Sequence, residues 1–448
     1  MKSVKDAYLR YPERIEGLFR SLDLSYPGLE KVRQAVASGN AVAAGEELLA
    51  YYRNAVTTGY LRREQPAESS ATNSEADSIV NDLFVFYDLP ARVPRTASGS
   101  LDWTYKGPDN DIEWAWGLNR HGHLISLMEA YFETGNPVYA RQIDAHLQDW
   151  VINSLPYPGV KSSTPQWRGL EVALRAKVWV RIFFALVNSE YLSPATKILL
   201  MSSLPEHTHY MQNFHAPAGN WLTMEMSGLA MVATAWPEFK QSREWVSYSK
   251  KNMLEGLKDQ VYADGVQKEL TSHYHQVAWY NFDHFREICQ QAGEPLPDDY
   301  TKMLEKMQHY TASTVRPTGY GILNNDSDKR YNRDHIINAA SDYGREDWLF
   351  IASNGTKGKR PDGPPSVVFP WAGQMVMRSG YDADAHWAFF DMGPWGTGHQ
   401  HNDKLHISIT AYGRDLLVDG GRFAYRGQLA DKFRGYATGS ASHNVLLI

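Results

Sequence analysis

Several side chains able to bind a metal ion lie within residues 396–404, which read Gly-Thr-Gly-His-Gln-His-Asn-Asp-Lys. Histidines two positions apart, such as His399 and His401, point to the same side of a strand, which is one route to a shared ion. Asp419 follows a predicted strand and His443 precedes another, so both can return to the same end of a sheet. Two imidazoles and a carboxylate are a ligand set typical of Zn²⁺. We therefore predict a metal site of His401, Asp419 and His443; the alternative is that these histidines are exposed or hydrogen-bonded to the backbone.

A second polar stretch, residues 264–275, contains Tyr274 between His273 and His275. A phenol whose pKa is lowered by nearby positive charge is suited to proton transfer. The Asp-Gly pair at the start of the stretch indicates a turn, and we expect a helix to begin near Gln276. The alternative for Tyr274 is a ring at the edge of the core with its hydroxyl in water.

Three further stretches combine aromatic, amide and charged side chains in a way that suits sugar binding. Asn220 lies at or near the start of a predicted helix, where an asparagine can cap the helix or present its amide to a ligand. Aromatic rings beside arginines can bind a sugar face and its carboxylate, although the arginines could equally form structural ion pairs. We expect substrate contacts from Trp116, Asn119, Arg120, His121, Trp167, Arg168, Trp221, Glu225 and His275.

Helical periodicity extends to about residue 355, which indicates where the first domain ends. Apolar residues recur at i, i+3, i+4 and i+7 over 124–131 and again over 138–151, on either side of a Gly-Asn-Pro break, which predicts a helical hairpin. Similar helices are predicted at 27–38, 41–54, 170–188, 194–213, 219–235, 242–257, 277–291 and 300–314. Antiparallel helical hairpins of this kind stack into solenoids or close into α/α toroids.

From about residue 366 the apolar pattern alternates, which predicts a β domain. Strands are expected at 374–378, 386–390, 405–410 and 415–418, and the run 445–448 resembles a strand cut off before its end. We therefore expect a helical domain at 1–355, a Gly- and Pro-rich linker at 356–365 and a β domain at 366–448. So short a β domain suggests that the chain is a fragment of a longer protein.

Composition excludes several classes of protein. The chain has 448 residues and a net charge of −6 without a Lys/Arg-rich run, which argues against a nucleic-acid binder. It contains one cysteine and therefore no internal disulfide, and no apolar stretch is long enough for a membrane span or a signal core. Aromatic residues make up 12% of the chain, which suits either a heavy core or a groove with sugar-stacking rings.

These motifs, in this order, resemble the heparinase II/III superfamily of polysaccharide lyases, most closely its heparinase III branch. The resemblance extends from Tyr26-Pro-Gly-Leu-Glu-Lys-Val-Arg33 through Gly219-Asn220, Tyr262-Ala-Asp-Gly265 and Tyr274-His275 to His399-Gln-His401 and His443-Asn444. It implies a multidomain α and β protein, in which an N-terminal incomplete α/α toroid of helical hairpins precedes a C-terminal antiparallel β-sandwich, here expected to be truncated.

The resemblance also implies roles for individual residues. Asn220 matches the asparagine that binds the uronate carboxylate, Tyr274 the catalytic tyrosine and His399 the histidine of the β domain. The predicted metal site matches one that is mainly structural in relatives, with Zn²⁺ as the first expectation and Ca²⁺ or Mn²⁺ as alternatives. Trp221 stands where relatives often have a histidine, so a second base at that position is not expected.

The function implied is β-elimination in a uronic-acid-containing polysaccharide, such as heparan sulfate or another glycosaminoglycan, giving 4,5-unsaturated products. Alternatives are a lyase for alginate or a bacterial exopolysaccharide, a non-catalytic glycan-binding protein, or an α/α-toroid glycoside hydrolase. The hydrolase would need carboxylates about 5 to 9.5 Å apart, for which Glu225, Glu269 and Asp264 are candidates. The expected partner is an acidic polysaccharide, with no nucleic acid or membrane, and the protein is expected to be a monomer or homodimer. A bacterial periplasmic or secreted location is expected from the resemblance, although the chain shows no leader.

Overall fold

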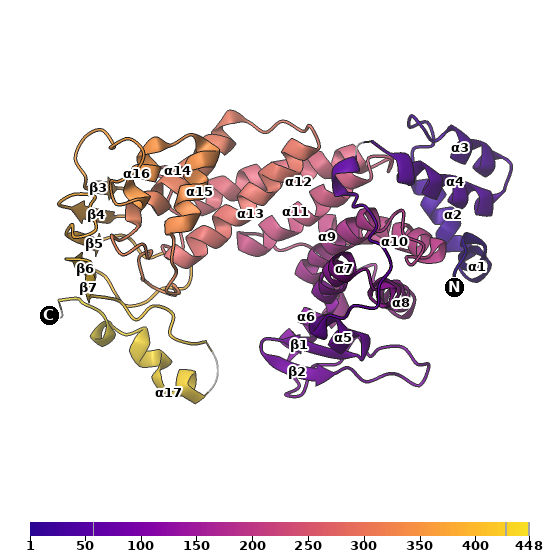
Figure 1. The fold of residues 1–448 in the computed structure, drawn as a ribbon, viewed down its shortest axis with the longest axis horizontal. Helices are drawn as coiled ribbons and strands as arrows, with labels where there is room; N and C mark the ends of the chain where they lie inside the picture. Colours follow the sequence, from indigo (N-terminus) through magenta and orange to yellow (C-terminus); the bar gives the residue numbers. More distant parts are fainter. Residues whose placement is uncertain (57, 426–427, 447–448) are drawn as a thin grey trace. The chain divides into compact units, whose positions relative to one another are not determined.

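The computed structural model describes the chain except residues 57, 426–427 and 447–448 (Figure 1). Backbone contacts divide the described residues into two compact units. Unit 1 comprises residues 1–252 and 288–294, and unit 2 comprises residues 253–287 and 295–448. Two long helices, α12 (Ser242–Gln260) and α13 (Ser272–Gln291), contribute residues to both units.

Unit 1 is built mainly from helices. They are α1 (Val4–Arg10), α2 (Pro12–Ser21), α3 (Glu30–Ala37), α4 (Ala41–Asn54), α5 (Ser74–Val80), α6 (Ile112–Asn119), α7 (Gly122–Thr134), α8 (Pro137–Asn153), α9 (Gly169–Ala185), α10 (Pro194–Asn213) and α11 (Gly219–Ala235). Short 3₁₀ turns η1 (Gly59–Leu61) and η2 (Pro165–Trp167) and the hairpin of β1 (Leu83–Phe86) and β2 (Leu89–Arg92) complete it. The helices predicted at 41–54, 194–213 and 219–235 are confirmed with those bounds.

The predicted hairpin at 124–151 is confirmed as α7 and α8. Gly135 ends α7 with a φ of 75°, a left-handed conformation that glycine adopts without strain. Asn136 then caps α8 by accepting a hydrogen bond from the N–H of Val138, and Pro137 takes the first helical position. The Gly-Asn-Pro triplet thus ends one helix and starts the next within three residues.

The core of unit 1 contains the large aromatic residues of α8 and α9. Trp150, Trp179 and Phe183 are completely buried. Close approach of α9 and α11 depends on Gly228, because a Cβ there would lie 2.8 Å from the Cβ of Ala173. Burial of each such side chain contributes about 1.5 to 3 kcal/mol, so this aromatic core is a main source of the unit's stability.

Unit 2 combines helices with one antiparallel sheet. Its own helices are α14 (Asp298–Thr314), α15 (Arg333–Tyr343), α16 (Glu346–Ala352), α17 (Gln428–Ala437) and the 3₁₀ turn η3 (Ser440–Ser442). The strands follow one another in the order β3 (Val367–Phe369), β4 (Gln374–Arg378), β5 (Trp387–Asp391), β6 (Ile407–Ala411) and β7 (Arg414–Leu417). The expected linker at 356–365 lies between α16 and β3. No strand includes Val445 or Leu446, so the structure does not show the predicted terminal strand there, and the rest of that run lies outside the described residues.

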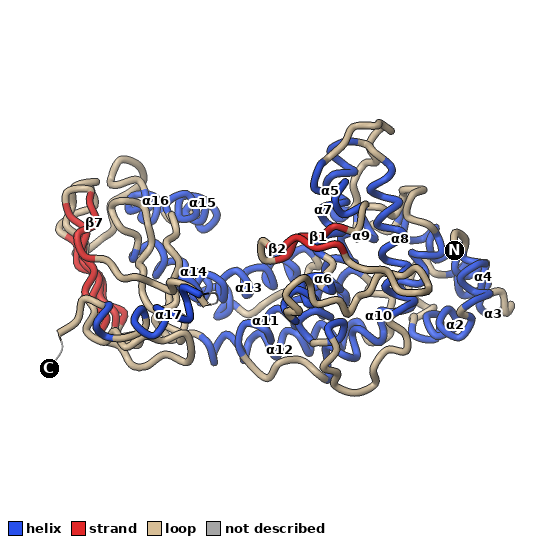
Figure 2. The backbone as a smooth tube through the Cα atoms, turned by 90° about the horizontal axis from the view of Figure 1, so that it is seen from below, coloured by secondary structure: helices blue, strands red, loops and turns tan. Residues whose placement is uncertain are grey.

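One face of the sheet packs against α14 (Figure 2). Tyr310 of α14 donates a hydrogen bond to Gln374 of β4 at 2.8 Å, and its ring meets Phe369 of β3 edge to face. Arg378 at the end of β4 donates to the carbonyl of Ser313 at 2.9 Å. The burial of β4 and β5 alternates along each strand, which is the pattern of a sheet covered on one face.

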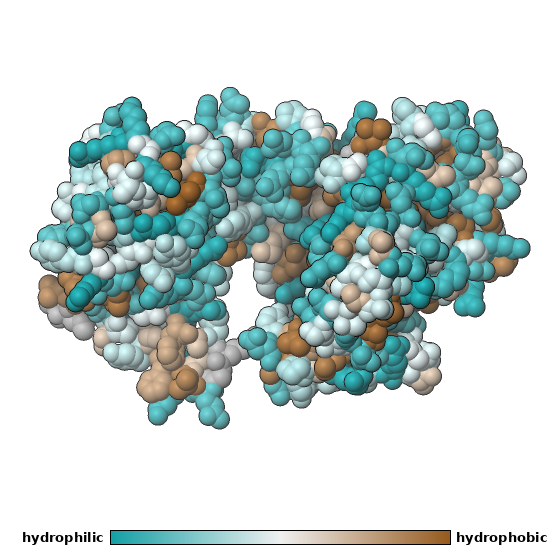
Figure 3. Space-filling view, viewed as in Figure 1, coloured by the Kyte–Doolittle hydropathy of each residue, from teal (hydrophilic) through white to brown (hydrophobic). Residues whose placement is uncertain are grey.

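The surface is consistent with the composition. The face shown in Figure 3 is mainly hydrophilic, with hydrophobic residues in scattered patches. Among the described residues, no helix is long and apolar enough to cross a membrane. The single cysteine, Cys289, is buried in α13, and burial raises the pKa of its thiol to about 11, so it is a poor nucleophile.

Candidate active site and metal site

Tyr274 lies in the first turn of α13, which begins at Ser272 and not near Gln276 as predicted. The N–H of Tyr274 donates to the hydroxyl of Thr271 at 2.9 Å. The N–H of Ser272 donates to Asn324, a residue from a distant loop, at 3.1 Å. The helix therefore starts earlier than predicted, because Thr271 just before it and Asn324 from a distant loop bind its free N–H groups.

His399 lies flat against the ring of Tyr274. The ring centroids are 3.7 Å apart and the ring planes differ by 14°. Nδ1 of His399 is 2.5 Å from Oε2 of Glu269, whose side chain is 12% exposed. A carboxylate can only accept, so Nδ1 carries a proton, and the tautomer that this contact selects has its lone pair on Nε2. Glu269 is itself held by a 2.9 Å hydrogen bond from Gln267.

A second chain of hydrogen bonds reaches the hydroxyl of Tyr274. Its oxygen is 3.1 Å from the hydroxyl of Tyr425, which in turn donates to Asp326 at 3.0 Å. Burial tends to raise the pKa of Asp326, but hydrogen bonds from His401 and Arg434 bring it below its usual value. Because the hydroxyl of Tyr425 donates its hydrogen bond to ionised Asp326, its oxygen is left to accept a hydrogen bond from the hydroxyl of Tyr274. Burial, followed by the bond with Tyr274 and the charge of Asp326, raises the pKa of Tyr425.

The predicted metal ligands His401, Asp419 and His443 are brought together. One ligand atom from each lies within 4.8 Å of the other two, and all three residues are buried. Nε2 of His401 is 2.8 Å from Asp326, and Nδ1 of His443 is 2.7 Å from Asp419. The opposite ring nitrogens, Nδ1 of His401 and Nε2 of His443, have no hydrogen-bond partner in the described structure. Each imidazole is thus oriented by a carboxylate and keeps a second nitrogen for a cation, the usual arrangement around a protein metal site.

Further negative charge surrounds these histidines. Asp403 is completely buried, and neither carboxylate oxygen has a partner among the described residues. Burial, with the charges of Asp391 and Asp419, raises the pKa of Asp403 to about 6. Buried carboxylates without donors are costly unless a cation is near, so the donor set fits a divalent ion.

Unit 1 holds a second group of predicted residues around Arg168. Its guanidinium lies 3.3 Å from the ring centroid of Trp116 and 4.6 Å from that of Trp221, which is 49% exposed. Glu171, completely buried, binds Arg168 at 2.5 Å and Arg120 at 3.0 Å. Asn220 is the second residue of α11, close to the helix N-terminus as predicted. Arg120, Arg168, Trp116, Trp221 and Asn220 are partly or well exposed and remain candidates for sugar contacts.

Asn119, His121 and Trp167, predicted to contact substrate, are instead part of the core. Asn119 is completely buried, and its amide donates to two carbonyls while its oxygen accepts from Trp150. His121 is also completely buried and accepts a hydrogen bond from Trp179 at 3.0 Å. Trp167 packs against Trp150, with 6.1 Å between the ring centroids. Their adjacency to arginines in the sequence therefore indicated internal hydrogen bonds and packing.

His275 and Glu225 are buried as well. His275 bonds the carbonyl of Met307 at 2.9 Å, and burial lowers its pKa to about 4, so it stays neutral and structural. Glu225 accepts the N–H of Ala216 at 2.7 Å, and burial raises its pKa to about 7. Asp264, a hydrolase candidate, accepts the N–H groups of Trp371 and Ala372, as a turn-stabilising carboxylate does.

Asp326 and Tyr425 were absent from the predicted site, and Glu269 was named only as a carboxylate candidate for the alternative hydrolase. Glu269 lies five residues before Tyr274, in the same polar stretch, so proximity in sequence could have suggested it. Asp326 belongs to the run Asn-Asn-Asp-Ser-Asp at 324–328, whose density of polar residues is a weaker signal. Nothing in the local sequence of Tyr425 indicates a contact with a tyrosine 151 positions away.

Comparison with known proteins identifies the relatives of this architecture. Residues 18–345 match the model of the heparinase II/III N-terminus, and residues 361–448 match the heparinase II/III-like C-terminal model. The chain belongs to the heparinase II/III family. The family predicted from the sequence motifs is thus confirmed.

Individual relatives agree with this assignment. A heparin-sulfate lyase of Pedobacter heparinus is 27% identical over 96% of this chain and 67% of its own length. A heparin-sulfate lyase of Bacteroides thetaiotaomicron is 24% identical over 96% of this chain and 66% of its own length. The chain thus spans about two thirds of the length of these relatives.

Solved structures confirm the fold class, an incomplete α/α toroid followed by an antiparallel β-sandwich. A crystal structure of heparinase III matches with a TM-score of 0.82 and 22% identity, covering 96% of this chain and 71% of that one. A heparan sulfate lyase from Pedobacter heparinus matches with a TM-score of 0.76 and 27% identity, covering 96% of this chain and 69% of that one. The five described strands of unit 2 form one sheet of this architecture.

Proposed function

We propose that the protein is a polysaccharide lyase that cleaves a glycosaminoglycan at uronic acid residues by β-elimination. The observation that carries this proposal is the stack of Tyr274 and His399, backed by Glu269, in a chain of the heparinase II/III family. Relatives with 24–27% identity named heparin-sulfate lyase support the lyase class and an acidic polysaccharide as substrate. Among such substrates, heparan sulfate of low sulfation is the first candidate, because the chain itself carries a net charge of −6.

The reaction removes the proton from C5 of the uronate and expels the glycosidic oxygen from C4. The C5 proton is a very weak acid, so the enolate-like intermediate must be stabilised at the carboxylate. We assign this stabilisation of the carboxylate to Asn220, since it matches the family's asparagine. A single donor of this kind contributes about 3 to 4 kcal/mol to transition-state stabilisation. Proton transfers at C5 and O4 then need a base and an acid within hydrogen-bond distance.

Tyr274 is the residue proposed to move these protons. In glucuronate, H5 and O4 lie on the same side of the ring, so the phenolate of Tyr274 can take the proton from C5 and return it to O4. In iduronate the two lie on opposite sides, and Nε2 of His399, with Nδ1 bound to Glu269, is the second group that can accept a proton. Stacking on His399 also restricts the ring of Tyr274 to one orientation.

Glu269→Gln is expected to lower kcat about 10- to 100-fold with little change in KM. The amide has the same shape but removes the charge that fixes the Nδ1–H tautomer of His399, and the loss of such orienting partners costs this much in comparable sites. Steady-state kinetics on heparan sulfate checks the prediction, with Glu255→Gln at an exposed position of α12 as the matched control. Wild-type kcat in Glu269→Gln would remove Glu269 from the mechanism.

The lyase proposal is tested by incubation with heparan sulfate, hyaluronan, chondroitin, alginate and bacterial exopolysaccharides. Ultraviolet absorbance from the new 4,5 double bond is expected with at least one glycosaminoglycan. Reducing ends without this absorbance would indicate a hydrolase. Unchanged substrate after long incubation would indicate a glycan-binding protein.

We also propose that His401, Asp419 and His443 bind one divalent cation, Zn²⁺ first, with a mainly structural role. The support is the unpartnered nitrogens of the two histidines and the unpartnered carboxylate of Asp403. The cation would offset the negative charge of these buried carboxylates and hold the ends of the sheet loops together. Asp326 binds both His401 and Tyr425, so the loops that carry this site also support the surroundings of Tyr274.

Removal of this cation is expected to lower the free energy of unfolding by about 4 kcal/mol, the contribution of a ligand at a thousand times its Kd. The measurement is metal content by mass spectrometry together with thermal unfolding before and after chelation. His443→Ala should contain no metal and melt at the same temperature with or without chelator, whereas the exposed control His386→Ala should behave as wild type. A metal-free wild-type protein, or one whose melting is insensitive to chelator, would contradict the proposal.

The cellular setting follows from the substrate. A polysaccharide does not cross a bacterial membrane unaided, so a periplasmic or secreted location is proposed. The protein is proposed to act as a monomer or homodimer, without nucleic acid or membrane partners. Fractionation of the native host checks the location.

A further inference from the structure

The loop from Asn324 to Arg330 has a buried half and an exposed half beside Tyr274. The buried half supports the start of α13, because Asn324 accepts the N–H of Ser272 at 3.1 Å and the hydroxyl of Ser327 lies 3.1 Å from that of Ser272. The exposed half carries Lys329 and Arg330. The loop that carries these two cations is therefore anchored to the start of the helix that carries Tyr274.

The exposed half continues along one face of α13. Asp328 lies 3.6 Å from His273, and Arg330 donates to the hydroxyl of Tyr280 at 3.2 Å. His273 and Tyr280 are seven residues apart and so lie on the same face of the helix, two turns from each other. The ring of His273 also meets that of Tyr274 edge to face, with 5.1 Å between centroids. Arg330 thus lies about two helical turns, or roughly 10 Å, along α13 from the first turn, which carries Tyr274.

Lys329 and Arg330 have no carboxylate partner among the described residues. The ammonium of Lys329 lies 4.7 Å over the ring of Tyr320, and the guanidinium of Arg330 lies 5.6 Å over the ring of Tyr280. The nearest acid in sequence, Asp328, is bound instead by Arg422 at 2.9 Å. Burial lowers the pKa of His273, and the positive charges of Arg422 and Arg330 act in the same direction. The charge of the two cations is therefore available to a ligand.

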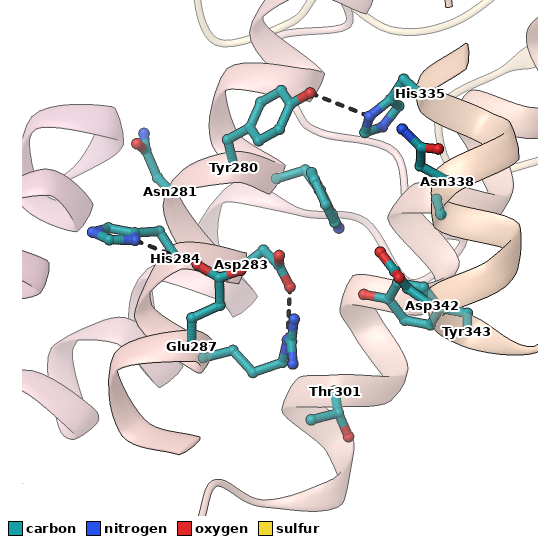
Figure 4. Close-up of a pocket in the computed structure, with 13 residues that line it drawn as sticks. Tyr280, Asn281, Asp283, His284, Glu287, Thr301, His335, Asn338, Asp342 and Tyr343 are labelled. Atoms are coloured by element: carbon teal, nitrogen blue, oxygen red, sulfur yellow. Dashed lines mark hydrogen bonds and ion pairs between the residues drawn. The ribbon is translucent and has the colours of Figure 1, made fainter. Parts of the chain in front are cut away.

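A neighbouring cavity of about 930 Å³ does not suit an anion. Figure 4 shows Asp283, Glu287 and Asp342 on its walls, and Tyr280 at its edge with its hydroxyl bonded to His335 at 3.2 Å. Burial, with the charges of Asp283 and Asp342, raises the pKa of Glu287, as expected where carboxylates face one another. Arg286 offsets only Asp283, which it binds at 2.7 Å, so an anionic sugar is favoured less in this cavity than beside the cations near Tyr280.

We propose that Lys329 and Arg330 form a subsite for an anionic group, a sulfate or a carboxylate, on a sugar next to the one cleaved at Tyr274. The inference rests on the proposed lyase function for the identity of the glycan. Arg330 can bind either group through two parallel hydrogen bonds, Lys329 adds a second charge, and the partly exposed ring of Tyr280 gives the sugar a surface to pack on.

The test is the binding of two heparosan hexasaccharides, one unsulfated and one N-sulfated, measured by calorimetry at low salt. Tyr274→Phe serves as the parent, so that cleavage of either ligand is slowed at least about 100-fold during the measurement. Lys329→Ala/Arg330→Ala is expected to weaken binding at least about fivefold, as loss of charge-assisted contacts does. Lys357→Ala/Lys359→Ala, which removes two exposed charges from the loop between α16 and β3, is the matched control.

The two ligands separate the two sources of negative charge. Weaker binding of both hexasaccharides assigns the subsite to the uronate carboxylate, and weaker binding of the N-sulfated one alone assigns it to the sulfate. Equal affinities in the parent and the double variant, an equal loss in the control, or no binding by the parent would overturn the proposal. Failure of the lyase function is recognised separately, because the wild type would then release no unsaturated product while these affinities are still measured.

Discussion

Tyr274→Phe is expected to lower kcat about 100- to 10,000-fold and to leave KM near the wild-type value. The change removes the phenolic oxygen that, as the phenolate, takes the C5 proton and returns it to O4, and positioned acid–base groups contribute this range of rate. The ring that stacks on His399 remains, so the substrate still meets the same surface. Initial rates of absorbance from the unsaturated product, over a range of substrate concentrations, measure both constants.

The control for this variant must remove a tyrosine hydroxyl elsewhere in unit 2. Tyr412, in the turn between β6 and β7, is 70% exposed, and Tyr412→Phe should retain wild-type kcat. Equal melting temperatures of the two variants would show that the fold is intact. A Tyr274→Phe protein with more than about a tenth of wild-type kcat would mean that another group transfers the proton.

Periodicity predicted the helices well, because it reports which face of each helix is buried. The hairpin of α7 and α8 shows this: apolar spacing placed both helices, and Gly135, Asn136 and Pro137 determine the break by their own backbone chemistry. The start of α13 was predicted four residues too late. Thr271, just before the helix, binds the N–H of Tyr274, but the N–H groups of Ser272 and His273 are bound by the distant residues Asn324 and Ser327. The two distant side chains leave no signal in the local sequence, whereas the cap by Thr271 was there to be read.

The candidate site was predictable where residue type restricts the chemistry. His401, Asp419 and His443 were placed together because imidazole and carboxylate at strand ends favour a shared ion. Substrate contacts were predicted less well, since an amide or an indole near an arginine serves a core as readily as a sugar. Asn119 and Trp167 illustrate this, because neighbours distant in sequence bury both.

Acidification from pH 7 to pH 5 is expected to destabilise the helical core of unit 1. Burial lowers the pKa of His121, His123 and His207 well below the ordinary value, so these side chains stay neutral when folded. Unfolded histidine, with a pKa of about 6.5, gains a proton in this range while the native state does not. The stability that these neutral histidines contribute is therefore fully present above pH 6.5 and is lost as the pH falls. At pH 5 the free energy of unfolding is lower by about 2 kcal/mol for each histidine.

Glu225 has the opposite effect on stability when the pH falls. Burial raises its pKa to about 7, so its native form takes up a proton before the unfolded one and recovers about 2 kcal/mol on the same change of pH. The net loss from these four groups is about 4 kcal/mol, which corresponds to a Tm lower by roughly 8 °C for a unit of this size. Thermal unfolding followed by circular dichroism at the two pH values measures it.

His123→Phe isolates one part of this acid effect. Neither ring nitrogen of His123 has a hydrogen-bond partner in the described structure, and its ring packs against Phe84 with 5.1 Å between centroids, so an apolar ring loses no bond there. The variant should keep its stability at pH 7. At pH 5 its free energy of unfolding should fall by about 2 kcal/mol less than that of the wild type, because phenylalanine gains no proton on unfolding. His209→Phe, at an exposed position of α10, should show the wild-type loss. An unchanged pH dependence in His123→Phe would mean that His123 is protonated inside the fold, and the core of unit 1 would then have to hold a buried positive charge.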